Sequence, residues 1–292
     1  MANVRAIRAH IKSVESTRKI TSSMKMVAAA KLKRTQGAMN SLRPYAAECG
    51  AMLAPLASRS RAASHPLLER REVRRICYVL FVGNRGLCGV YNTALLKYIE
   101  TRAERNGVEE DLIVCGRWGR DLIAATGLRV IDTFDDISDA PDAAEAKRIS
   151  DRLRELYLAG EADEIVLVYE SYVSALRQVP TMQRLLPVKV PQTKDTAEVI
   201  FEPSEDKVID TLAEMYLESS VYSVLLESKT GEHTARMTAM TAASDNTEQM
   251  ISRLELELNH ARQSAITTEI SEIVGGANAL EKTDEEAKRG KG

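Results

Sequence analysis

The sequence is poor in the residues that many catalytic and binding sites need. Only 4% of its 292 residues are aromatic, and it contains four histidines and four cysteines. The cysteines, Cys49, Cys77, Cys88 and Cys115, form no C-x-x-C pair, which argues against a zinc site and a redox motif. We interpret them as reduced structural thiols. No nucleophile, base or metal constellation is evident, so we expect no metal, no cofactor and no catalytic residues.

Long hydrophobic runs are also missing. No apolar stretch approaches the roughly 18 residues that a membrane span needs. The N-terminus alternates charged with apolar residues, unlike the apolar core of a signal peptide. A content of 44% hydrophobic and 28% charged residues is ordinary for soluble proteins. We therefore expect a soluble chain that is cytoplasmic when first synthesised.

Proline is absent from both ends of the chain. All eight prolines lie between Pro44 and Pro203, and glycine is rare in the terminal segments. Because proline breaks helices and glycine weakens them, the proline-free residues 1–43 and 204–292 indicate two long helices, which are predicted to span residues 1–57 and 207–280. At ~1.5 Å per residue, the second would be on the order of 110 Å long. Such a helix is too long to be buried in the middle of its own chain.

Apolar and small residues recur in both predicted helices with the three-four spacing of a coiled-coil seam. The first helix has Val4, Ile7, Ile11 and Val14 and, after a phase shift, Ile20, Met24 and Val27. The second has Met237, Met240, Ser244, Thr247, Ile251, Leu254, Leu258, Ala261 and Ala265. Because the helices leave opposite ends of the middle segment, we expect them to pack antiparallel. The pattern loosens at residues 229–231, where the sequence allows either a continuous helix or a break.

Charge is distributed unevenly along the chain. Residues 1–43 carry ten Lys and Arg but one acid, Glu15, which gives a net charge of +9 and leaves −11 on the remaining 249 residues. Such a basic arm suggests an acidic partner, whether nucleic acid, anionic membrane or protein. The predicted helix over 207–280 has eleven acids and five bases, so it would complement the arm within the same chain.

The middle of the chain alternates between strand-like and helix-like segments. Strands are predicted at 75–82, 111–115, 128–134 and 164–172, and helices at 92–106, 117–126 and 141–159. That order indicates βαβ units, and hence a Rossmann-like α/β domain over residues 75–195 with a mainly parallel sheet. Residues 58–74 and 196–206 are predicted linkers. The charged tail, 281–292, is predicted to be disordered.

A glycine-rich stretch, FVGNRGLCGVYN at residues 81–92, follows the first predicted strand directly. A phosphate loop would need Lys and Ser or Thr after its last glycine, and a dinucleotide loop needs G-x-G-x-x-G. Here the glycines are Gly83, Gly86 and Gly89, and Val90 and Tyr91 follow them. We therefore interpret the stretch as a tight turn that packs closely on another part of the protein.

Four stretches match one known family in the family's own order. They are MKMVAAAKL at 24–32, GNRGLCG at 83–89, EHTARMTAMTAASDN at 232–246 and ARQSAITTEISEIVGGANAL at 261–280. The last carries the family's C-terminal signature through Ile266, Thr267, Glu269, Glu272, Gly276 and Ala277. With these stretches the sequence resembles the gamma subunit of F-type ATP synthases from residue 1 to about 280.

The resemblance implies a rotor. In that family the terminal helices form an antiparallel coiled coil inside a ring of alternating α and β subunits, and the α/β domain lies near the ε subunit and the membrane c-ring. The delta subunit belongs to the same complex. Catalysis belongs to the β subunits, so this chain would be non-catalytic and would couple proton or other ion flow to ATP synthesis. It would be peripheral, on the cytoplasmic side of a bacterial inner membrane.

The resemblance also implies which residues contact the β subunits. The polar and mixed contacts are Met24, Lys25, Arg262, Gln263, Thr267 and Glu269, and the residues in an apolar sleeve are Ile270, Ile273 and Val274. We expect Lys25, Arg262 and Gln263 to make contacts that change as the shaft rotates. For the apolar positions the alternative is packing within the chain's own coiled coil, and for Lys25 it is a solvated helix face.

Three other functions remain as alternatives from the residues alone. A basic coiled-coil nucleic-acid-binding protein would use residues 1–43, although this arm has no aromatic residue for base stacking. A membrane-surface protein would use the same helix as an amphipathic anchor, but its apolar face is narrow. A nucleotide-dependent enzyme would need a phosphate loop in the middle domain, and the glycine-rich stretch lacks its features.

Overall fold

The computed structural model describes residues 2–57, 65–69, 71–102, 107–119, 123, 127–188 and 202–289. The chain divides into two compact units. Residues Lys25–Ala239 form one, which we call the α/β unit, and Met1–Met24 with Met240–Gly292 form the other, which we call the helical unit.

Two long helices, α1 (Ala2–Ala57) and α5 (Glu205–Arg289), contribute to both units. α5 is continuous through residues 229–231, so the helix break that the loosened pattern left open does not occur. It also continues beyond residue 280, where we expected it to end. The prediction that the tail is disordered is wrong for residues 281–289, because Glu, Lys, Ala and Arg are strong helix formers.

The α/β unit contains a five-stranded sheet with the strand order β3-β2-β1-β4-β5. The strands are β1 (Arg75–Phe81), β2 (Glu109–Cys115), β3 (Arg129–Phe134), β4 (Glu164–Ser174) and β5 (Arg177–Leu186). The four predicted strands pair in parallel, and β5 pairs antiparallel with β4. The mainly parallel sheet is therefore confirmed, but β5 was not predicted.

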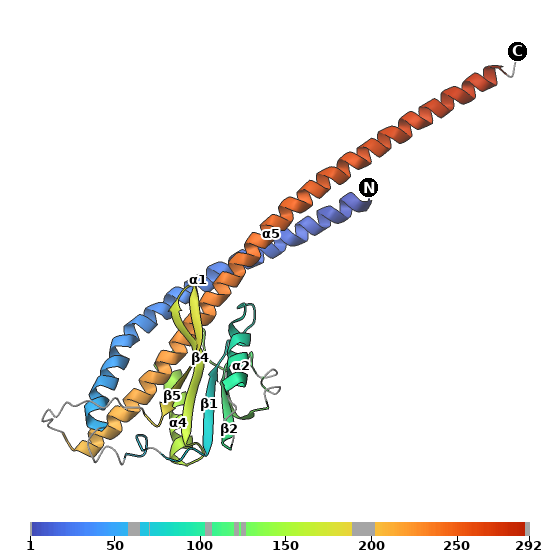
Figure 1. The fold of residues 1–292 in the computed structure, drawn as a ribbon. Helices are drawn as coiled ribbons and strands as arrows, with labels where there is room; N and C mark the ends of the chain where they lie inside the picture. Colours follow the sequence, from blue (N-terminus) through green and yellow to red (C-terminus); the bar gives the residue numbers. More distant parts are fainter. Residues whose placement is uncertain are drawn as a thin grey trace. The chain divides into compact units, whose positions relative to one another are not determined.

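Helices cover the sheet. Two of the predicted helices are confirmed as α2 (Tyr91–Arg102) and α4 (Ala143–Leu158). The helix predicted at 117–126 falls largely outside the described residues, as do the end of the one predicted at 92–106 and part of each linker. Figure 1 shows α2, α4 and the strands with α1 in blue and α5 in orange to red.

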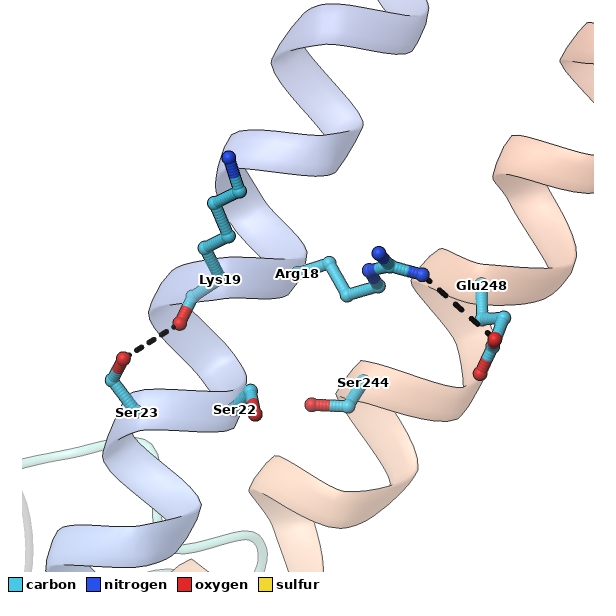
Figure 2. Close-up of a pocket in the computed structure, with 6 residues that line it drawn as sticks. All are labelled: Arg18, Lys19, Ser22, Ser23, Ser244 and Glu248. Carbon is cyan, nitrogen blue, oxygen red and sulfur yellow. Dashed lines mark hydrogen bonds and ion pairs between the residues drawn. The ribbon is translucent and has the colours of Figure 1, made fainter.

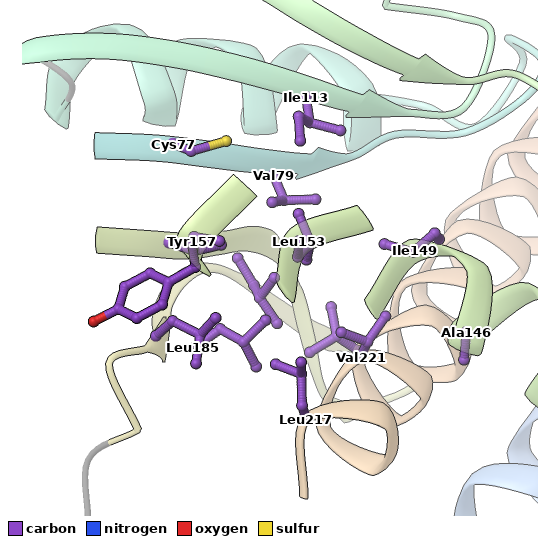
Figure 3. Close-up of a cluster of buried hydrophobic side chains, with 14 of the residues drawn as sticks. Cys77, Val79, Ile113, Ala146, Ile149, Leu153, Tyr157, Leu185, Leu217 and Val221 are labelled. Atoms are coloured by element: carbon purple, nitrogen blue, oxygen red, sulfur yellow. The ribbon is translucent and has the colours of Figure 1, made fainter. Parts of the chain in front are cut away.

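Strand β1 lies at the centre of the sheet and is buried on both faces. Cys77 and Val79 belong to a buried cluster that includes Leu153 of α4 and Val221 of α5, and Figure 3 shows Val79 pointing toward Leu153. The alternate residues, such as Leu80, pack instead with side chains of α2. Both faces are covered from Ile76 to Phe81, and this part of the strand is an uninterrupted hydrophobic run, as is usual in parallel sheets.

In the helical unit, α1 and α5 pack side by side and antiparallel (Figure 1). Val14 of α1 forms an apolar cluster with Ile251 and Leu254 of α5. Further along α1, the Thr21 hydroxyl lies 2.9 Å from the Ser244 hydroxyl. Residue numbers rise along α1 as they fall along α5, which confirms the predicted antiparallel packing.

The predicted seam is confirmed for α5 but only in part for α1. All nine seam residues of α5 are buried or half-buried, as are those of α1 up to Val14. After the phase shift, however, Ile20 and Val27 are exposed, and Thr21 and Ala28 are buried in their place. The prediction of Ile20 and Val27 is therefore wrong by one residue, because small side chains occupy this part of the seam.

Candidate functional site: the surface of α5 and its anchor on the glycine loop

The last part of α5 presents a long exposed surface. All residues from Ile266 to Ala277 are exposed in the helical unit. The expected contact residues Arg262, Gln263, Thr267 and Glu269 are exposed as well. The Thr267 hydroxyl donates a hydrogen bond to the Gln263 carbonyl of its own helix, at 3.0 Å. Their remaining polar groups are therefore accessible to a partner.

The three residues expected in an apolar sleeve lie on the same surface. Ile270, Ile273 and Val274 are 56%, 66% and 52% exposed. Steps of three and four residues connect Gln263, Thr267, Ile270 and Val274, so these four share one helix face. On this face, apolar side chains follow polar ones along the helix. Because the apolar side chains are exposed, packing in the chain's own coiled coil does not explain why they are apolar.

Met24 and Lys25 lie on α1, one on each side of the boundary between the two units. Met24 is half-buried, whereas Lys25 is exposed. The structure does not bring these two residues together with the α5 surface as one described site. Their common role with Arg262 and Glu269 remains a prediction.

An open groove of about 640 Å³ lies between α1 and α5 in the helical unit. Figure 2 shows Arg18 reaching across it toward Glu248, with Ser22 and Ser244 between the helices. The Arg18–Glu248 ion pair measures 3.8 Å, and both side chains are exposed. Such pairs contribute little to stability. The groove is therefore a solvated, polar part of the helix pair.

The glycine loop packs against α5, which confirms the interpretation of a tight turn. The Gly83 amide donates to the Asn92 side-chain oxygen at 2.8 Å. A Cβ atom added at Gly83 would lie only 3.0 Å from the Glu232 carboxyl carbon. Glycine is needed at this position because a side chain of α5 occupies the space. The loop serves close packing with the helix.

A buried ionic cluster forms the other side of this contact. The Glu232 carboxylate accepts from Lys229 and Arg236, each at 2.8 Å. Burial alone would raise the pKa of Glu232, but the charges and hydrogen bonds of Lys229 and Arg236 lower it below its usual value. Arg236 also donates to the carbonyls of Arg85 and Gly86, at 3.1 and 3.4 Å. The cluster thus holds the loop on the helix.

Sequence reasoning missed this cluster, although a signal was present. Lys229, Glu232 and Arg236 are spaced i, i+3 and i+7, which places them on one face of a helix. Gly231, in the middle of the set, suggested a break instead. In the structure its missing side chain makes room for Tyr91, whose ring would lie 3.3 Å from an added Cβ.

All four cysteines are free and buried, as expected of structural thiols. Burial, together with nearby Asp111, raises the pKa of Cys77 to about 12, so this side chain stays a thiol. Among the described residues, no three His, Cys, Asp or Glu side chains come together as a metal site. In the same part of the chain, no helix is long and apolar enough to cross a membrane.

Comparisons with known proteins agree on one family. A family model described as ATP synthase matches residues 3–280. The ATP synthase gamma chain of Desulfitobacterium hafniense is 44% identical over 281 residues, which cover 96% of this chain and 100% of the relative. The gamma chain of Moorella thermoacetica is 43% identical with the same coverage.

A solved structure supports the fold. A chain in the cryo-EM structure of the Euglena gracilis mitochondrial ATP synthase, OSCP/F1/c-ring, in rotational state 3, matches with a TM-score of 0.70 at 17% identity. The match covers 96% of this chain and 95% of that chain. At this identity the likeness concerns the fold alone. The near-complete, 44% identical relative decides the family, and this chain belongs to the ATP synthase gamma-chain family.

Proposed function

We infer that this chain acts as the central-stalk rotor subunit of ATP synthase and has no catalytic role of its own. The observation that carries this conclusion is the match to gamma chains over almost the whole chain. The exposed surface at the end of α5 supports it, because a rotor shaft needs a surface that partners can contact. The family match gives no support to a basic nucleic-acid-binding protein.

The proposed mechanism is a coupling between shaft angle and the conformations of the catalytic subunits. One shaft without threefold symmetry touches three chemically identical β subunits differently, so each angle stabilises a different set of their open and closed states. The difference in contact energy between angles is the coupling free energy. Ion flow that turns the shaft would thereby drive ATP release.

On α5, the proposed polar contacts to the β subunits come from Arg262, Gln263, Thr267 and Glu269. A hydrogen bond to a charged group contributes roughly 1.5–3 kcal/mol. A contact of that size, made at one angle and absent at another, would change a conformational equilibrium on the order of 10- to 100-fold. On the neighbouring stretch, Ile270, Ile273 and Val274 would turn within an apolar sleeve that requires no fixed hydrogen bonds.

The proposed partners are those of the family. They are the α and β subunits around the helices, the ε subunit and the c-ring near the α/β unit, and the delta subunit in the same complex. The chain would be attached to the membrane only through this complex. We propose the cytoplasmic side of a bacterial inner membrane as its location.

Substitution of the proposed contacts in the assembled complex tests the role of the shaft surface. Arg262→Ala and Lys25→Ala should each lower torque and change the ATPase rate, because each removes a contact that varies with angle. Lys97→Ala is the matched control, since Lys97 is an exposed cation on α2 outside the proposed contacts. If both variants couple hydrolysis to rotation as the wild type does, the assignment of these residues is wrong.

A further inference from the structure

Both terminal helices contact the same residue of the α/β unit. Asp139 lies in the segment between β3 and α4. Its carboxylate accepts from the Lys31 ammonium of α1, with Nζ and Oδ2 2.5 Å apart. Its main-chain carbonyl accepts from His233 of α5, whose Nε2 lies 2.8 Å away. One residue of the domain is thus linked to α1 and α5 at once.

The histidine in this arrangement has a defined role. Because its partner is a carbonyl, Nε2 of His233 must carry the proton. The ring is fully buried, and Nδ1 has no hydrogen-bond partner among the residues that the structure describes. Burial lowers the pKa of His233. The side chain is therefore a neutral donor, and its Nε2 hydrogen bond goes to Asp139.

The two helices are also tied directly to each other beside this point. The hydroxyl oxygens of Thr35 on α1 and Thr230 on α5 lie 3.0 Å apart, and both residues are buried. Thr35 is one helical turn from Lys31, and Thr230 is three residues from His233. Asp139 therefore contacts α1 and α5 close to the point where a hydrogen bond joins the two helices to each other.

The segment that carries Asp139 is held firmly on its own domain. Asp142 and Glu145 form a capping box at the start of α4, and Glu145 also accepts from the Ser138 amide at 2.8 Å. From the glycine loop, the Asn84 side chain donates to the Ile137 carbonyl at 2.6 Å. These contacts lie on both sides of Asp139. They fix the backbone from which the carboxylate and the carbonyl of Asp139 reach the two helices.

We propose that Asp139 is a positioning residue that joins α1 and α5 to the sheet within the α/β unit, so that these parts of the two helices turn with the sheet as one body. This inference rests on the proposed rotor function and names one point at which torque passes from the sheet to both helices. Apolar contacts, such as Met39 against Tyr172 and Leu226, are non-directional and permit sliding. Hydrogen bonds weaken steeply when misaligned, so they resist sliding.

Because the Lys31–Asp139 ion pair contributes little to folding stability, its effect on rotation can be measured separately from any effect on folding. The Lys31 and Asp139 side chains are 35% and 39% exposed, and ion pairs of this exposure add little to folding stability. Asp139→Asn keeps the carbonyl that His233 uses and removes the charge that Lys31 needs. The variant should fold and assemble normally but hold α1 less firmly.

The test measures the angular fluctuation of the rotor. Assembled complexes are stalled without ATP, and a bead on the α/β unit reports the variance of its angle. We expect Asp139→Asn and Lys31→Met each to raise the variance about twofold, because the first removes the charge that strengthens the hydrogen bond from Lys31 and the second removes its donor. The exchanged pair, Lys31→Asp with Asp139→Lys, should restore it. The urea midpoint of the isolated chain should not change.

Asp136→Asn is the matched control. Asp136 lies in the same segment, but it pairs with Arg148 of α4 at 2.6 Å and touches neither terminal helix through that pair. An unchanged variance in both test variants, or an equal rise in Asp136→Asn, would overturn the proposal. If the wild type still rotates normally, only the role of Asp139 is overturned, and the proposed rotor function stands.

A second measurement needs no partner. Backbone amides of residues 28–39 in the isolated full chain should exchange hydrogen faster in Asp139→Asn than in Asp136→Asn, because α1 is held less firmly. If the wild type never rotates, the rotor function fails, and this exchange experiment decides the link at Asp139 alone. Equal exchange in the two variants would contradict the link.

Discussion

Glu170 is an acidic side chain in the core of the α/β unit, and its substitution should stabilise the protein in a pH-dependent way. It lies on β4 opposite Pro180 of β5 and is 5% exposed. Burial raises the pKa of Glu170 from 4.5 to about 7. The folded protein therefore holds a proton on Glu170 at pH values where the unfolded chain has released it.

The sign and size of the effect follow from this difference. Between pH 4.5 and about pH 7, Glu170 binds more protons in the folded state than in the unfolded state. The contribution of Glu170 to the free energy of unfolding therefore falls as pH rises through this range and is constant above it. At ~1.4 kcal/mol per pKa unit, the ionised carboxylate costs about 3 kcal/mol at high pH. Glu170→Gln removes the charge, so it should stabilise the protein by up to about 3 kcal/mol near pH 8 and hardly at all near pH 4.

Urea unfolding of the full chain at several pH values measures this effect. The single tryptophan, Trp118, lies in the α/β unit, and its fluorescence reports unfolding of that unit. Glu161→Gln is the control, because Glu161 is exposed just before the same strand. A gain in stability that is equal at low and high pH, or a loss near pH 8, would refute the reasoning about Glu170.

Two further substitutions test packing within the α/β unit and within the helical unit, one substitution in each. Gly83→Ala should cost roughly 1–3 kcal/mol by urea unfolding, because the new methyl group meets Glu232 and Asn92 at 3.0–3.2 Å; an unchanged midpoint would show that the loop can move away. Leu254→Ala should cost roughly 2–3 kcal/mol in thermal unfolding followed by circular dichroism, whereas exposed Leu256→Ala should cost less than about 0.5 kcal/mol. Equal losses of stability in Leu254→Ala and Leu256→Ala would contradict the assignment of Leu254 to the seam.

The sequence predicted the parts of the fold that depend on periodicity. The terminal helices and the α5 seam repeat one spacing over many residues, so a local error changes little. At Ile20 and Val27 the pattern failed, because Thr21 and Ala28 are small and weakly apolar and gave no signal. Strand β5 was missed since Pro180 lies within it. An edge strand tolerates proline because its outward amide needs no partner.

Periodicity does not say what an apolar residue packs against. Ile251 and Ile270 have similar neighbours on the same helix, yet Ile251 is buried in the chain's own helix pair and Ile270 is exposed. Likewise, the motif containing Glu232 gave no hint that its carboxylate lies against Gly83, because that contact joins residues almost 150 positions apart. Both distinctions depend on tertiary structure, which a single sequence does not contain.

Direct observation of rotation tests the central claim. Leu176 is 98% exposed, and the four natural cysteines are buried, so Leu176→Cys offers one accessible thiol for attaching a bead. Complexes purified through this chain would be fixed to a surface by their β subunits and supplied with ATP. We expect ATP-dependent rotation of the bead in one direction. ATP hydrolysis by complexes that contain the chain while the bead stays still would contradict it.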